Sequence, residues 1–228
     1  MGVGTKIVEG LQPLVDLVYP PRCPACGEAV ASQGGLCLNC WSGIVSPEGH
    51  DIAENGESIG EKSVIAATLY NDISRKLILN FKHGGKTSLA KLLGQMMASK
   101  LPLANGDHSP LIVPVPLHRT RLWQRGYNQA ALLARDLSNR HRGELLVDGL
   151  VRTKRTPSLG GLGKKERRAA LNGSIAIRKS RATRLQDRRI LLVDDVLTSG
   201  ATSDACIAAL KSGGARSVQL VCFARVVD

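Results

Sequence analysis

The most informative stretch of this chain is RILLVDDVLTSGAT, residues 189–202. Its four apolar residues, Ile190 to Val193, are typical of a strand that is buried on both faces of a parallel sheet. Two carboxylates, Asp194 and Asp195, are expected where this strand leaves the sheet. The small residues after them lead into an apolar pattern at helical spacing, which ends at a pair of glycines. The sequence therefore predicts a strand, a turn and a helix.

Such a turn is a suitable site for a phosphate group. A helix that begins there presents unpaired backbone N–H groups and the positive end of its dipole, and the hydroxyls of Thr198, Ser199 and Thr202 add donors. The adjacent carboxylates suit the hydroxyls of a diol or a hydrated Mg²⁺, so the ligand indicated is a sugar phosphate. The alternative, a buried strand followed by solvated acids, stays open because loose glycine-containing motifs occur by chance.

The same stretch resembles the phosphoribosyl pyrophosphate (PRPP) motif of the type I phosphoribosyltransferases. This resemblance implies an α/β fold, a doubly wound parallel sheet. It also implies that Asp194 and Asp195 hold the ribose hydroxyls and Mg²⁺. The residues implied to hold the 5′-phosphate are Thr198, Ser199, Gly200, Ala201 and Thr202.

The composition is that of a globular chain. The length of 228 residues suits one domain with an appendage, and 43% apolar residues suffice for a core. Aromatic residues make up 3%, which argues against a broad stacking platform for single-stranded bases. No run approaches 18 uncharged apolar residues, and the first 20 residues do not resemble a secretory leader. These features predict a soluble cytoplasmic protein.

The net charge of +12 is unevenly distributed. Residues 1–60 hold two basic and seven acidic side chains, whereas residues 61–228 hold 29 basic and 12 acidic ones, a net charge of +17. Such a field attracts PRPP and nucleic acid alike. The alternative is an ordinary solvated basic surface.

Two C-x2-C pairs lie ten residues apart near the N-terminus. Four thiolates at this spacing close a tetrahedral Zn²⁺ site without an open position, which predicts a structural metal rather than a catalytic one. Disulfides are the alternative, which a reducing compartment disfavours. The other two cysteines, Cys206 and Cys222, are expected to be small core residues. The expected zinc ligands are Cys23, Cys26, Cys37 and Cys40.

Charge and turn composition divide the chain into three parts. Residues 1–45 are expected to form an N-terminal helix, with an apolar face over Ile7 to Val18, followed by the zinc module. Residues 46–61 are rich in Gly, Glu, Ser and Asn and are expected to be a linker. Residues 62–228 would then form the larger domain. The zinc module has too little core to fold alone, so the metal is expected to stabilise it.

Basic residues follow two other predicted elements. A basic, glycine-containing break begins at Lys82, after a helix, where it is expected either to contact phosphate or to be a plain turn. A second buried strand, Leu111 to Pro116, is followed by His118, Arg119 and Arg125. Residues after parallel strands meet at one edge of a sheet, so these three are expected to neutralise a departing pyrophosphate. His118 is equally well read as a hydrogen-bonding loop residue or a proton donor.

The phrases PVPLH and RGYNQ, between the cysteine module and LLVDDVLTSGAT, resemble the ComF family of phosphoribosyltransferase-like proteins tied to DNA uptake in natural competence. The resemblance runs from about Pro20 to Val226, and Lys82 matches the lysine that follows the first helix in that family. It implies Zn²⁺ as a structural metal and Mg²⁺ with PRPP. The catalytic residues that we expect on this basis are Asp194, Asp195, Lys82 and Arg125.

Two functions are compatible with these residues. The first is an enzyme that transfers a phosphoribosyl group and releases pyrophosphate. The second is a PRPP sensor that contacts single-stranded DNA and partner proteins of the competence machinery. The basic, glycine-rich segment 153–172 would serve either as a lid or as a nucleic-acid contact. A zinc-dependent reader of duplex DNA ranks last, because the cysteine module is acidic and no recognition helix is evident.

Overall fold

The computed structural model describes residues 19–47, 64–83, 85–104, 106, 109–154 and 173–227. The expected helix over Ile7 to Val18, most of the linker and most of segment 153–172 lie outside these ranges. The division of the chain at residues 45 and 61 therefore stays a prediction.

Five strands of the described residues form a parallel sheet in the order β1-β7-β6-β2-β3. The chain passes from β2 to β3 in one direction and from β6 to β7 in the other. The carboxyl ends of β2 and β6 therefore flank a topological switch point, where open α/β sheets bind ligands. The strands are β1 (Val64–Leu69), β2 (Leu111–Pro114), β3 (Glu144–Leu145), β6 (Arg189–Leu197) and β7 (Ser217–Arg225).

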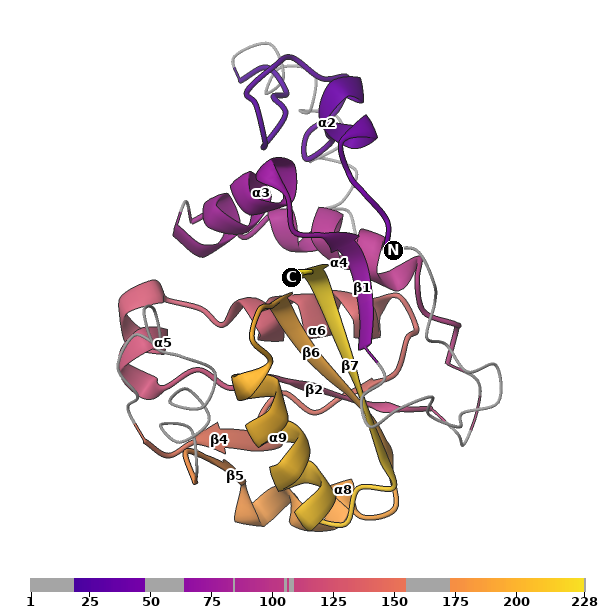
Figure 1. The fold of residues 1–228 in the computed structure, drawn as a ribbon, viewed down its shortest axis with the longest axis vertical. Coiled ribbons are helices and arrows are strands. Elements are labelled where there is room, and N and C mark those ends of the chain that lie inside the picture. The colour runs from indigo at the N-terminus through magenta and orange to yellow at the C-terminus, as the bar shows by residue number, and fades with distance from the viewer. Residues whose placement is uncertain are drawn as a thin grey trace, which may run out of the picture.

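Helices cover both faces of the sheet, which confirms the expected doubly wound α/β fold (Figure 1). One face carries α3 (Asp72–His83), α4 (Leu89–Ala98) and α6 (Gln129–Asn139), and the other carries α9 (Ala201–Ser212). Smaller elements are α2 (Leu38–Ser42), α5 (Arg119–Arg125), the 3₁₀ turn η2 (Lys179–Arg181), α8 (Ala182–Leu185) and the antiparallel hairpin of β4 (Leu150–Arg152) and β5 (Ile175–Ile177).

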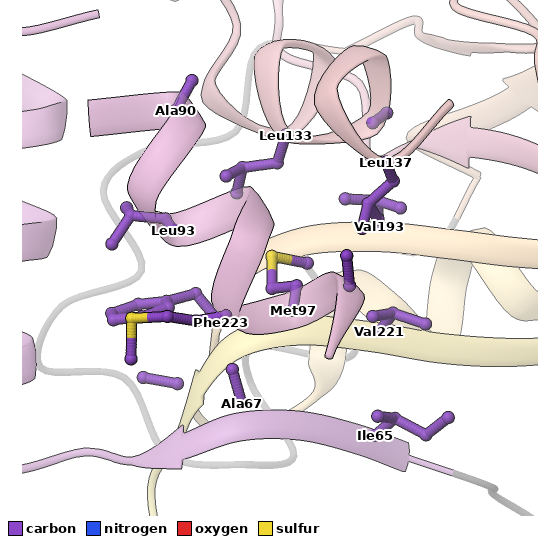
Figure 2. Close-up of a cluster of buried hydrophobic side chains, with 14 of the residues drawn as sticks. Ile65, Ala67, Ala90, Leu93, Met97, Leu133, Leu137, Val193, Val221 and Phe223 are labelled. Carbon is purple, nitrogen blue, oxygen red and sulfur yellow. The ribbon is translucent and has the colours of Figure 1, made fainter. Parts of the chain in front are cut away.

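The core has two layers because β6 is apolar on both faces. Leu191 and Val193 belong to the cluster under α3, α4 and α6, whereas Ile190 and Leu192 belong to the cluster under α9. This alternation is the period of two expected of a strand buried on both sides. Figure 2 shows the first layer, in which Val193, Val221 and Phe223 of the sheet meet Leu93 and Met97 of α4 and Leu133 and Leu137 of α6.

The acidic pair does not lie where β6 leaves the sheet, and this expectation was wrong. The strand continues through Asp194 and Asp195 to Leu197, paired with β7 as far as Arg225. On its other side the pairing with β2 ends at Pro114↔Val193, since β2 is shorter than expected. The acids therefore lie in the part of β6 that extends beyond β2, where no strand of the described residues pairs with that edge.

The cysteine module packs on the outer side of α3 (Figure 1). It contains α2 and a single antiparallel bridge between Arg22 and Ala29. Its buried cluster consists of three cysteines, so very little apolar surface supports it. Among the described residues, no helix is long and apolar enough to cross a membrane.

Candidate functional site

The two carboxylates of the acidic pair point to opposite faces of the sheet. By the alternation of β6, Asp194 shares the face of Leu192, toward α9, and Asp195 shares the face of Val193, toward α3. Asp195 is buried, and its Oδ2 lies 3.1 Å from Nζ of Lys82 at the end of α3. The structure thus brings together three of the expected catalytic residues.

Asp194 is held in an environment that disfavours its charge. Burial and the charge of Asp195 together raise the pKa of Asp194 to about 7, against a backbone hydrogen bond and the charges of Lys82 and Arg152. Its Oδ1 accepts a hydrogen bond from the backbone N–H of Asp195 (2.9 Å). A divalent cation would relieve the repulsion between these two carboxylates, and oxygen donors are the ligands that Mg²⁺ prefers. In donor type, each of these carboxylates therefore suits that metal, each on its own face of β6.

The turn after β6 has the features of an anion site. Gly200 adopts φ +72°, and α9 begins immediately after it, with its first helical bond from Asp204 N–H to the Gly200 carbonyl (2.8 Å). The N-cap residue of α9 is this glycine, which has no side chain to cap the helix, and the N–H groups of the first turn point toward the turn. An added Cβ on Gly200 would meet no atom closer than 3.7 Å. Glycine is therefore required for its backbone conformation rather than for space.

His118 is the N-cap of α5. Its Nδ1 accepts a hydrogen bond from the backbone N–H of Thr120 (3.3 Å) and lies 2.9 Å from the Thr120 hydroxyl. The structure therefore gives His118 the hydrogen-bonding role, one of its two expected roles. Within the described residues, neither Arg119 nor Arg125 forms an ion pair with the acidic pair, and Lys82 is the cation that does.

The RGYNQ motif joins three elements at the switch point. Asn128 caps α6 through the backbone N–H of Ala130 and donates to the Val115 carbonyl (3.0 Å), just after β2. The hydroxyl of Tyr127 donates to the Phe81 carbonyl at the end of α3. These contacts tie α3 and α6 to the carboxyl end of β2, a structural role that the sequence analysis did not assign.

Arg125 is oriented by a buried amide. Its Nη1 donates to Oε1 of Gln129 (2.8 Å), which is buried at the start of α6. The Nε2 atom of Gln129 is also buried and has no hydrogen-bond partner in the described part of the chain. Arg125 is therefore positioned at the carboxyl end of β2, the strand next to the acidic pair.

Sequence reasoning missed Arg152 as a site residue. This half-buried side chain ends β4, and it lies within the electrostatic reach of both Asp194 and Arg121. Burial lowers the pKa of Arg152, as does the charge of Arg121, while the charge of Asp194 opposes them. The only sequence signal of Arg152 was its place just before segment 153–172. The hairpin that brings Arg152 near Asp194 depends on the pairing of β4 with β5, which local sequence does not show.

The four N-terminal cysteines converge as expected. Their Sγ atoms all lie within 4.8 Å of one another, and those of Cys26 and Cys37 are 3.5 Å apart. A tetrahedral zinc site with Zn–S bonds of about 2.3 Å has its sulfurs roughly 3.8 Å apart, so the arrangement fits Zn²⁺. Burial raises the pKa of Cys23, but backbone hydrogen bonds from Cys37, Ala25 and Cys26 outweigh it and bring that pKa down to about 6. All six cysteines are free, and Cys206 and Cys222 are buried in the larger domain.

This parallel sheet, with an acidic pair and the glycine-capped start of a helix at its switch point, is that of a phosphoribosyltransferase-like domain. The model of the phosphoribosyl transferase domain matches residues 125–227, and that of the double zinc ribbon domain matches residues 14–50. The zinc-ribbon match and the four thiols together support structural zinc.

The chain belongs to the ComF family. It is 30% identical to Competence protein F of Haemophilus influenzae over 209 residues, which cover 90% of this chain and 85% of that protein. The DNA utilization protein YhgH of Escherichia coli K12 is 26% identical over 90% of each chain. Competence protein ComFC of Bacillus subtilis is 27% identical over 86% of this chain and 74% of that protein.

Among solved structures, a hypoxanthine phosphoribosyltransferase from Staphylococcus aureus overlaps 64% of this chain and 74% of its own. Its TM-score is 0.35 and its sequence identity 16%. The sheet order and the family models carry the assignment of the domain.

Proposed function

We propose that this protein binds PRPP with Mg²⁺ at the junction of β6 and α9 and transfers the phosphoribosyl group to an acceptor, with release of pyrophosphate. The observation that carries this proposal is the acidic pair, which lies on the part of β6 that extends beyond β2, a short turn before α9 and its glycine N-cap. PRPP carries an anionic phosphate and a vicinal diol on one small molecule. The phosphate matches the start of α9, and the diol matches the acidic pair beside it.

Each group has a role in this scheme. Residues 198–202 hold the 5′-phosphate through backbone N–H groups and hydroxyls, and Asp194 and Asp195 hold the ribose hydroxyls. Lys82 holds the carboxylate of Asp195 in place through their ion pair. Mg²⁺, bound with PRPP at the acidic pair, would neutralise charge on the pyrophosphate.

Release of pyrophosphate is helped by the basic residues after β2. Arg119 and Arg125 supply positive charge as the bond to the ribose breaks, and His118 holds the start of α5 in place. Gln129 fixes the guanidinium of Arg125. In a loose transition state, this preorganised positive charge is the main contribution of the protein to catalysis. Arg152, near Asp194, adds a further positive charge on the α9 side.

A second candidate function is a PRPP-sensing module that binds single-stranded DNA, in keeping with relatives named for competence and DNA utilization. The observation that favours it is α5, which has no buried residue and exposes Trp123 to 90% between Arg121 and Arg125. One exposed indole among arginines can stack a base while the cations contact phosphate. Acceptor turnover is not needed for this function.

Binding and turnover experiments separate the two functions. Titration calorimetry with PRPP and Mg²⁺ tests the shared site, and Asp195→Asn should weaken binding at least tenfold. Pyrophosphate release with a panel of bases and amines then tests the enzyme. Binding without any turnover, together with salt-dependent binding of single-stranded DNA that is lost in Trp123→Ala, would favour the sensor.

A further inference from the structure

Helix α3 lies between the zinc module and the acidic pair. On its outer side, the Asn71 amide near its start donates to the Gly43 carbonyl (2.7 Å). The Asn80 amide, two and a half turns later, donates to the Pro24 carbonyl (2.7 Å), which lies inside the first C-x2-C pair. The helix is therefore fastened to the module at both ends.

Between these two hydrogen bonds, α3 and the zinc module pack closely against each other. Ile73 packs against the buried cysteines that would hold zinc. A Cβ on Gly43 would lie 2.6 Å from Cδ1 of Ile73, so the module and α3 are in close contact at this point. Ile73 and Asn80 are seven residues apart and thus share one face of the helix.

The next turn of the same helix reaches the candidate PRPP site. Lys82 follows Asn80 by two residues, which turns it about 200° around the helix axis, away from the module. Its Nζ lies 3.1 Å from Asp195. The Phe81 carbonyl between them accepts a hydrogen bond from Tyr127, so the turn that carries Lys82 is fixed on the side of α6 as well.

We infer that the zinc module positions Lys82 at the acidic pair through α3, with Asn80 as the positioning residue. Zinc fixes the backbone of the first cysteine pair, and hence the Pro24 carbonyl, because a module with so small a core depends on its metal. Loss of zinc frees the outer face of α3 and lets the turn that carries Lys82 fray. Since coupling between binding free energies is reciprocal, PRPP and Mg²⁺ should also raise the affinity of the module for zinc. This part of the inference rests on the proposed PRPP site.

The first test needs no PRPP. Zinc is removed from the full chain with a chelator under reducing conditions, and amide hydrogen exchange is followed by mass spectrometry. We expect peptides from residues 78–83 to lose protection about tenfold or more, while peptides from β6 and β7 stay protected. Unchanged protection of residues 78–83 in the zinc-free protein would overturn the inference.

The second test keeps the zinc and removes one hydrogen bond. Asn80→Ala leaves every cysteine and Lys82 in place, and Leu79→Ala, at an exposed position next to it, is the matched control. One hydrogen bond is worth about 1 kcal/mol, so Asn80→Ala should weaken PRPP binding about fivefold, with Leu79→Ala unchanged. Zinc content, measured by a colorimetric chelator, must stay at one per chain in both variants.

The outcomes distinguish this inference from the proposed function. Equal PRPP affinity in wild type, Asn80→Ala and zinc-free protein would overturn the coupling and leave the PRPP site standing. If wild type binds no PRPP, the proposed function fails, and the exchange experiment alone decides whether zinc positions α3.

Discussion

The zinc module and the α/β domain are stabilised by different means. The module buries three cysteines and little else, whereas the domain buries two continuous apolar layers on either side of β6. One region therefore owes its structure to metal–thiolate bonds and the other to apolar burial. The two regions should therefore respond to different perturbations, even though α3 contacts both of them.

The largest effect is expected from removing one thiolate. Cys40→Ser takes a buried ligand from the four-thiolate site, and structural zinc in small modules accounts for most of their folding free energy. We expect zinc content to fall from one per chain to near zero and the module to unfold. Limited proteolysis should then cut within residues 19–47, while the α/β domain keeps a cooperative thermal transition. A variant that retained stoichiometric zinc would contradict this division.

The reverse perturbation is a cavity in the core of the domain. Leu133 of α6 is fully buried against the sheet, and Leu133→Ala should lower the free energy of unfolding of the domain by about 3 kcal/mol. Urea unfolding followed by circular dichroism measures this loss. Zinc content should not change, because no cysteine is touched. Concurrent loss of zinc would show that the two regions fold as one unit.

A smaller effect, which depends on pH, is expected at Asp194. Its pKa is about 7 in the folded protein, above the value near 3.9 in an unfolded chain. Between these values the folded state binds a proton that the unfolded state does not, so this group lowers stability as pH rises from about 4 to 7. The free energy of unfolding of Asp194→Asn, relative to wild type, should thus increase by about 2–3 kcal/mol from pH 5 to pH 8. The measurement is urea unfolding of both proteins at the two pH values.

The reason for this gain is that a binding site can hold groups in unfavourable surroundings. The same variant should bind PRPP with Mg²⁺ at least tenfold more weakly. The same difference in stability between the variant and wild type at both pH values would mean that the acidic pair is not strained without a ligand.

The smallest change in stability is expected at Gly200. Alanine fits the space but not the positive φ, so Gly200→Ala should cost about 1 kcal/mol in thermal unfolding. PRPP binding should be lost to a greater degree, since the backbone N–H groups that follow would be reoriented. Gly214→Ala, also at positive φ but at the far end of α9, is the matched control for strain alone. Equal loss of PRPP affinity in both variants would argue against a phosphate site at Gly200.

Local sequence patterns were enough to predict the two central strands, β2 and β6, the order of motifs and the cysteine cluster. Ile190 to Val193 predicted a doubly buried strand because all four residues are apolar, and the two cysteine pairs have zinc spacing. The end of β6 was missed because it depends on how far a neighbouring strand extends, which is a tertiary property. Arg152 was missed for the same reason, since a hairpin brings it near Asp194.

Contacts between distant segments also determine the roles of the site residues. Lys82 could be aligned with a family position, but its pairing with Asp195 spans more than a hundred residues. The RGYNQ motif was expected to contribute charge, whereas Tyr127 and Asn128 turned out to fasten α3, α6 and β2 together. Such roles are read from contacts and not from spacing.

The most direct measurement is titration calorimetry of PRPP into the zinc-loaded full chain with Mg²⁺, in parallel with Asp195→Asn. We predict one molecule bound per chain and at least a tenfold loss of affinity in the variant, because the buried carboxylate beside Lys82 holds the ribose and its metal. No binding to the wild-type protein, or equal binding to both proteins, would contradict the account.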